Sequence, residues 1–188
     1  MNKASSSKIV KVDDPSVILN QNIETPPVLK VIDIPINTLQ RLLKKYQLTL
    51  HLIENNEPIS GSFWGDSEAG LIGNKVYVRE DTPIHSLLHE SCHYICMDET
   101  RRNKLDTNAE GDYDEENAVC YLQILLAEEL AEMTSERMMQ DMDSWGYTFR
   151  LGSAKAWFEN DAEDALAWLQ AKRLLDSNGK PNFLLRKQ

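Results

Sequence analysis

The residues best suited to chemistry lie in one short stretch, HESCH, at positions 89 to 93. Two histidines separated by three residues lie one turn apart on a helix, so both imidazole rings face the same side. Neutral imidazoles at this spacing can share one tetrahedral zinc ion. Glu90 stands beside them and can reach a water on that metal and take its proton during hydrolysis. We therefore predict that His89 and His93 are metal ligands and that Glu90 is the catalytic base.

A catalytic zinc site normally has three protein ligands, so a third donor is expected downstream. No histidine follows His93, and a carboxylate or a thiolate must supply this donor. The segment DYDEENAVCYLQILLAEEL predicts a second helix. Glu115 extends the apolar face of that helix, where a carboxylate needs a charged partner or a metal. We predict Glu115 as the third ligand, with Glu116, which points more nearly along Cys120 and Gln123, as the second choice.

Sequence patterns around the motif predict the elements that position it. Apolar residues spaced three and four apart predict a short helix that Asn37 caps, and alternation over residues 48–52 predicts a half-buried strand. The glycine-rich stretch 59–81 predicts a strand, a turn and a strand. Thr82 and Pro83 then indicate the start of the HESCH helix. Its apolar face is predicted to pack on the core and contains Ile84, Leu88, Cys92 and Ile95.

Other polar and aromatic side chains near the motif are expected to have packing roles. His85 is predicted to be a partly exposed residue in the first turn of the helix. Tyr94, Tyr113 and Tyr147 could each donate a hydrogen bond to a transition-state oxyanion. Packing is the expected role of each of the three.

Composition limits the class of protein. With 188 residues, 41% of them hydrophobic, the chain can build one core. A formal charge of -10 argues against direct binding to nucleic acid or to an anionic membrane. The chain has no long apolar run and no export signal, so a cytoplasmic location with reduced cysteines is expected. Between Asp106 and Asp143 the only Lys or Arg is Arg137, which predicts a solvated acidic face or a preference for basic substrates.

The HESCH stretch, together with EENA beginning at position 115, resembles the gluzincins, zinc metallopeptidases with two histidines and a glutamate as ligands. The strand NKVYVRE and the second motif are most similar to the ImmA/IrrE metallopeptidase-like family, over residues 60–130. The resemblance implies His89, His93 and Glu115 as zinc ligands and Glu90 as the base. It also implies that NKVYVRE is an edge strand along which an extended peptide lies.

The chain departs from this family at Val119, where a polar residue commonly contacts a zinc histidine. We expect an α+β, zincin-like domain with a small, mostly antiparallel sheet packed on the HExxH helix and a helical C-terminal half. Residues 1–30 are predicted to form an extended or flexible arm. Residues 31–188 are predicted to form one domain, in which 31–135 are the catalytic unit and 136–188 a helical extension.

The expected function is that of a zinc-dependent metallopeptidase that hydrolyses a peptide bond in a protein substrate. The family resemblance implies a regulatory protein as one such substrate. The alternative is a non-catalytic protein-interaction module whose fold is stabilised by a structural zinc ion. In that alternative His89, His93, Cys96 and Cys120 would form a closed His₂Cys₂ site.

Overall fold

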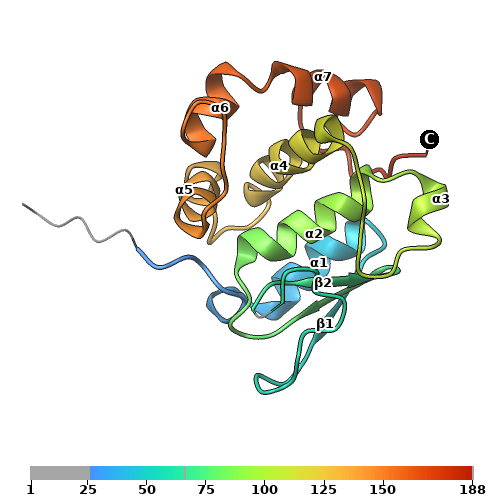
Figure 1. Ribbon diagram of the computed structural model, residues 1–188, viewed down its shortest axis with the longest axis vertical. Coiled ribbons are helices and arrows are strands. Elements are labelled where there is room, and N and C mark those ends of the chain that lie inside the picture. Colours follow the sequence, from blue (N-terminus) through green and yellow to red (C-terminus); the bar gives the residue numbers. More distant parts are fainter. Residues whose placement is uncertain (1–25, 66, 188) are drawn as a thin grey trace, which may run out of the picture.

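The computed structural model describes residues 26–65 and 67–187. Within this part the chain forms seven α-helices and a three-stranded sheet, which confirms the predicted α+β class. Helix α2 (Ile84–Cys96) crosses the middle of the molecule, with the sheet and α1 on one side and α4 to α7 on the other (Figure 1). Most of the predicted arm, residues 1–25, lies outside the described part of the chain.

The C-terminal half is helical, as predicted, and the strands all lie in the N-terminal half of the described chain.

The helices and strands have the following bounds. A short 3-10 helix, η1 (Val31–Asp33), precedes the first α-helix. The other helices are α1 (Ile36–Lys45), α3 (Glu99–Arg102), α4 (Tyr113–Ala127), α5 (Ser135–Trp145), α6 (Ala154–Asn160) and α7 (Glu163–Ala171). The strands are β1 (Thr49–Leu52), β2 (Gly70–Ile72) and β3 (Lys75–Val78).

The sheet corrects two predictions. Its order is β1-β3-β2, with β3 parallel to β1 and antiparallel to β2, so the sheet is mixed and not mostly antiparallel. The predicted edge strand NKVYVRE contains β3, which is the central strand. Val76 in β3 lies opposite Leu50 on one side and Leu71 on the other. Because both sides of β3 are paired, it has no free edge for a substrate.

Helix α2 is buried on almost all sides, between the sheet and α4. Its buried positions include the predicted core stripe and extend well beyond it. The two residues of α2 outside the buried set are His89 and His93, which are partly exposed. Along α2, solvent therefore reaches mainly the two predicted metal ligands.

One core connects the predicted catalytic unit with the C-terminal extension, since its buried residues run from Val31 to Leu175. Leu29, just before position 31, is also hydrogen-bonded to this domain. The N–H of Leu29 donates to Asp141 on α5 at 2.9 Å, and its carbonyl accepts from Ile84 at 2.8 Å. Leu29 is thus hydrogen-bonded to two helices, α5 and α2.

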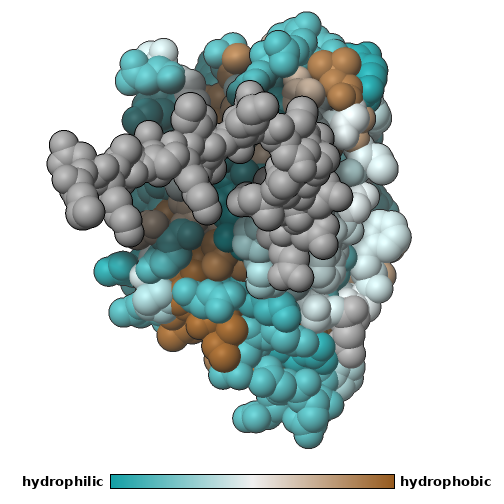
Figure 2. All heavy atoms as spheres, turned by 90° about the vertical axis from the view of Figure 1, so that its left-hand side faces the viewer, coloured by the Kyte–Doolittle hydropathy of each residue, from teal (hydrophilic) through white to brown (hydrophobic). Residues whose placement is uncertain are grey.

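Figure 2 shows a largely hydrophilic face on which hydrophobic side chains gather in a few separate patches. Among the described residues, the structure has no helix with the length and apolar character needed to cross a membrane.

His85 is fully buried, which corrects the prediction of partial exposure. Its ring packs against Trp145 at 5.0 Å and Tyr147 at 5.6 Å between ring centroids. Neither ring nitrogen has a hydrogen-bond partner within the described residues. Burial, with a smaller contribution from the charge of His89, lowers the pKa of His85 to about 3.

We expect His85 to make the protein less stable in mild acid. The unfolded chain binds a proton on this ring below about pH 6.5, whereas the folded chain does not until about pH 3. Stability is therefore lost as pH falls through this window, by roughly 2 to 3 kcal/mol at pH 4.5. Urea unfolding of metal-free wild type and His85→Phe at pH 7.5 and 4.5 measures the effect. Between pH 7.5 and pH 4.5, the unfolding free energy of His85→Phe should fall by roughly 2 to 3 kcal/mol less than that of wild type. Equal losses in both proteins would contradict the prediction.

Candidate metal centre

Three side chains from two helices converge on one point. The Nε2 atoms of His89 and His93 on α2 lie 3.2 Å apart. The carboxylate of Glu116 on α4 lies 3.2 Å from His89 Nε2 and 3.4 Å from His93 Nε2. A tetrahedral zinc with bonds of about 2.0 to 2.1 Å separates its ligand atoms by about 3.4 Å. The three donors therefore have the spacing that one zinc ion requires.

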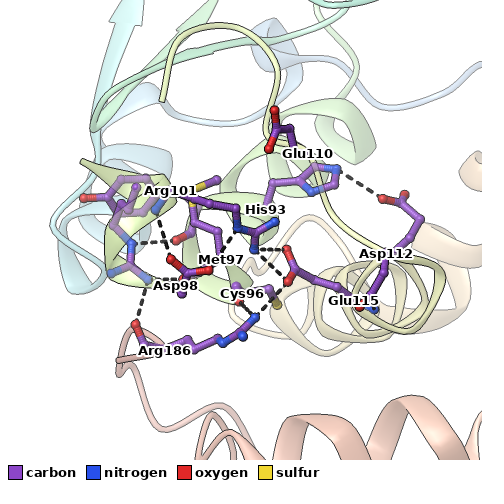
Figure 3. A network of polar contacts seen from close by, with 12 residues as sticks. His93, Cys96, Met97, Asp98, Arg101, Glu110, Asp112, Glu115 and Arg186 are labelled. Atoms are coloured by element: carbon purple, nitrogen blue, oxygen red, sulfur yellow. Dashed lines mark hydrogen bonds and ion pairs between the residues drawn. The ribbon is translucent and has the colours of Figure 1, made fainter. Parts of the chain in front are cut away.

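Glu115, predicted as the third ligand, lies outside this group of donors. It is buried, as its place on the apolar face predicted, but two arginines are its partners. Arg101 Nη2 donates to both carboxylate oxygens, at 2.5 and 2.7 Å, and Arg186 Nη1 donates to one at 2.8 Å (Figure 3). Ion pairing thus satisfies the buried carboxylate, and Glu116, the second choice, is the glutamate that faces the histidines.

Gln123 holds His89 in the orientation that a metal ligand needs. Its side-chain oxygen lies 2.7 Å from His89 Nδ1, while its side-chain nitrogen donates to the sulfur of Met138. With the oxygen accepting, Nδ1 carries the proton and Nε2 keeps its lone pair for a metal. Gln123 lies seven residues, or two helical turns, after Glu116, so the two side chains share one side of α4. This spacing could have identified Gln123 in the sequence as a neighbour of the site.

Replacing Gln123 by Leu should weaken zinc binding about 10- to 100-fold, the usual effect of losing a hydrogen bond to a ligating histidine. Gln123→Glu keeps an acceptor at the same place and serves as the matched control. Competition titration with a zinc-chelating dye measures both affinities. Wild-type affinity in the Leu variant would show that Gln123 does not position His89.

Without metal, the two histidines differ in protonation. Burial, followed by the charge of His89, lowers the pKa of His93 to about 3. Burial also lowers the pKa of His89, but interactions with Tyr147, Cys120 and Glu116 outweigh it and raise the pKa well above its ordinary value. His89 therefore holds the proton of the pair, and a metal ion must displace it.

Glu90 lies on α2 beside the group and lines the same cleft. Its side chain is 6% exposed. Burial raises the pKa of Glu90 to about 7; the charge of His89 opposes this shift, and Glu68 and Glu116 add to it. The predicted base is thus placed next to the predicted ligands, as the HESCH spacing requires.

The three tyrosines considered as hydrogen-bond donors to a transition-state oxyanion lie in different surroundings. The ring of Tyr147 meets the ring of His89 edge-on, with centroids 5.7 Å apart. Tyr113 is exposed, and Tyr94 is buried with Arg102 over its ring at 5.2 Å. Of these three tyrosines, Tyr147 is the one whose ring packs against a predicted ligand.

The cysteines stand outside the donor group. Within the described residues, the side chains close enough to hold one ion include no cysteine. Cys120 interacts with His89 but is not part of that group. Cys96 is fully buried, and its carbonyl accepts a hydrogen bond from Arg186. The His₂Cys₂ arrangement expected for a closed structural site is not formed.

A cleft of about 270 Å³ opens over the donor group. Its walls come from two loops, one with Phe63 and Trp64 and the other spanning residues 107–111. The second loop is strained at Thr107, a β-branched residue with a φ of 68°. The cleft gives a ligand access to His89, Glu90, His93 and Glu116.

The outer edge of β2, next to the cleft, is occupied by the chain itself. The N–H of Leu71 donates to Gly61, and the carbonyl of Leu71 accepts from Thr107. One residue before β2, the N–H of Ala69 donates to the hydroxyl of Ser86 on α2. A substrate strand cannot pair with Leu71 while these bonds are present.

Comparison of the chain with protein-family models, with curated proteins and with solved structures gives no match.

Proposed function

We propose that the protein is a zinc-dependent metallopeptidase that hydrolyses a peptide bond in a protein substrate. The observation that carries the proposal is the convergence of His89, His93 and Glu116, with Glu90 in the same cleft. The resemblance of HESCH to gluzincins supports it. So does the arrangement of α2 between a small sheet and α4, which is the basis for proposing a zincin-like fold.

In this proposal His89, His93 and Glu116 hold the metal. A bound zinc ion supplies a Lewis acid that polarises a carbonyl and lowers the pKa of a coordinated water. Gln123 fixes the tautomer of His89 through Nδ1. Glu90 holds and returns a proton at its carboxylate, and the buried sides of α2 keep bulk water away from it. With three protein donors, a bound zinc ion would have room for a water or a substrate oxygen, whereas a structural site with four protein ligands would not.

Substituting Glu90 by Gln tests the proposal. The variant should bind zinc as wild type does, because Glu90 is not among the three donors, and should lose activity by about 10²-fold or more. Zinc content is measured by plasma mass spectrometry. Cleavage is measured by mass spectrometry of a proteome-derived peptide mixture incubated with each protein.

Cys96→Ser is the matched control for a structural site and should retain zinc. Equal cleavage by wild type and Glu90→Gln would contradict the assigned base. Zinc loss in Cys96→Ser, with zinc kept in Glu116→Gln, would favour the non-catalytic interaction module instead.

A further inference from the structure

Two aromatic side chains at the mouth of the cleft are exposed to an unusual extent. Trp64 is 75% and Phe63 is 55% exposed, and their rings pack edge-on with centroids 5.1 Å apart. Large apolar side chains that stay exposed beside a cleft are typical of binding surfaces. The pair is attached to a fixed part of the fold, because Gly61 accepts a hydrogen bond from Leu71 in β2 and Ser62 forms a β-bridge with Gly70 at the start of β2.

The attachment of this loop to β2 is close. A side chain at Gly70 would meet the carbonyl oxygen of Ser60 at 1.9 Å, so only glycine fits there. The segment that leads into Phe63 and Trp64 is therefore packed against the strand beside the cleft. A ligand that enters the cleft meets an apolar wall held in a defined place.

Three carboxylates line the cleft, together with the two histidines. Apart from the two histidines, its charged residues are Glu90, Glu110 and Glu116, and no Lys or Arg lines it. Glu116 faces the histidines and Glu90 lies beside them. This leaves Glu110, which is exposed and whose carboxylate has no hydrogen-bond or ion-pair partner within the described residues. The net charge of -10 adds to the attraction for a cationic ligand.

Recognition in this cleft must depend on side chains. The backbone groups of Leu71, which a peptide strand would use, are already bonded to Gly61 and Thr107. Strand addition at the edge of β2 is therefore closed, and specificity comes from what the two loops present. One loop presents an aromatic pair and the other presents a carboxylate.

We propose that the cleft takes a peptide segment in which a bulky apolar side chain neighbours a Lys or Arg. The apolar side chain packs on Phe63 and Trp64, and the basic side chain pairs with Glu110. This inference rests on the proposed function, because it names the substrate class of the same site.

Binding to peptide pools tests the inference separately from cleavage. The pools are randomised except for a central pair, which is Phe-Lys, Phe-Glu, Ser-Lys or Ser-Glu. Zinc-loaded Glu90→Gln protein is immobilised, and the retained fraction of each pool is measured. We expect the Phe-Lys pool to be retained about tenfold better than Ser-Glu, the scale of one aromatic anchor with its charged neighbour. Trp64→Ala should remove the advantage of Phe, and Glu110→Lys should shift the preference from Lys to Glu.

Two exposed residues outside the cleft provide matched controls. Leu151→Ala removes an exposed apolar side chain, and Glu132→Gln removes an exposed carboxylate; both should leave the preference unchanged. Equal retention of all pools, or a preference that survives Trp64→Ala and Glu110→Lys, would overturn the inference. Wild-type enzyme is then incubated with the pools. Selective binding without cleavage contradicts only the peptidase proposal, whereas cleavage without selectivity contradicts only this inference.

Discussion

Replacing Glu116 by Gln is expected to remove most zinc binding and leave the chain folded. Glu116 supplies the one carboxylate of the three-donor group. Losing a ligand should weaken binding by more than the roughly 100-fold seen when only a supporting hydrogen bond is lost. Its side chain is 49% exposed, so the unfolding free energy of the metal-free protein should change by only about 0.5 kcal/mol. Zinc titration and urea unfolding of the metal-free protein measure the two effects.

Asp114→Asn is the matched control, since this acidic residue is exposed in the same first turn of α4. It should keep full zinc affinity. If Glu116→Gln also binds one zinc per chain with wild-type affinity, Glu116 is not a ligand. The donor group described here would then be wrong.

Replacing Glu115 by Ala is expected to have the opposite effect to Glu116→Gln. The free energy of unfolding should fall strongly, and the affinity for zinc should change little. The carboxylate joins Arg101 after α2 to Arg186 in the C-terminal tail, and it is buried. Removing it leaves two guanidinium groups without their shared partner. We expect the unfolding free energy to fall by about 3 kcal/mol, the lower end for a broken buried pair, because the Arg101 side chain is 22% exposed.

Urea unfolding at pH 7.5 measures this loss, and zinc titration of the folded fraction should show less than about a tenfold change, below the effect of losing a supporting contact. Glu115→Gln keeps the size of the side chain and one acceptor oxygen, so it should fall between wild type and Glu115→Ala. Unchanged stability together with lost zinc would return Glu115 to the role that the sequence suggested.

The sequence alone determined the local elements and the residues that α2 contributes to the candidate site. The three-and-four spacing of apolar residues located α1 and α2, and the alternation at residues 48–52 located β1. Ser153 immediately precedes α6, and its side-chain oxygen accepts a hydrogen bond from the N–H of Ala156, the cap that a serine at this position typically forms. His89 and His93 had to share a side of α2, because residues four apart in a helix always do.

Only the tertiary structure decided which glutamate completes the group. Glu115 and Glu116 are adjacent, and neighbouring residues in a helix point about 100° apart. The rotation of α4 about its axis therefore selects one of them. That rotation depends on partners distant in the sequence, because Arg186 lies 71 residues after Glu115 and pairs with it at 2.8 Å.

The same distinction applies to the sheet. The pattern of NKVYVRE predicts a strand, and β3 is there, but a single strand's pattern does not specify its neighbours. The connection that runs through residues 53–69 places β2 at the edge and β3 in the centre. Spacing along one helix or strand is fixed by local geometry, whereas rotation and strand order depend on contacts between distant segments.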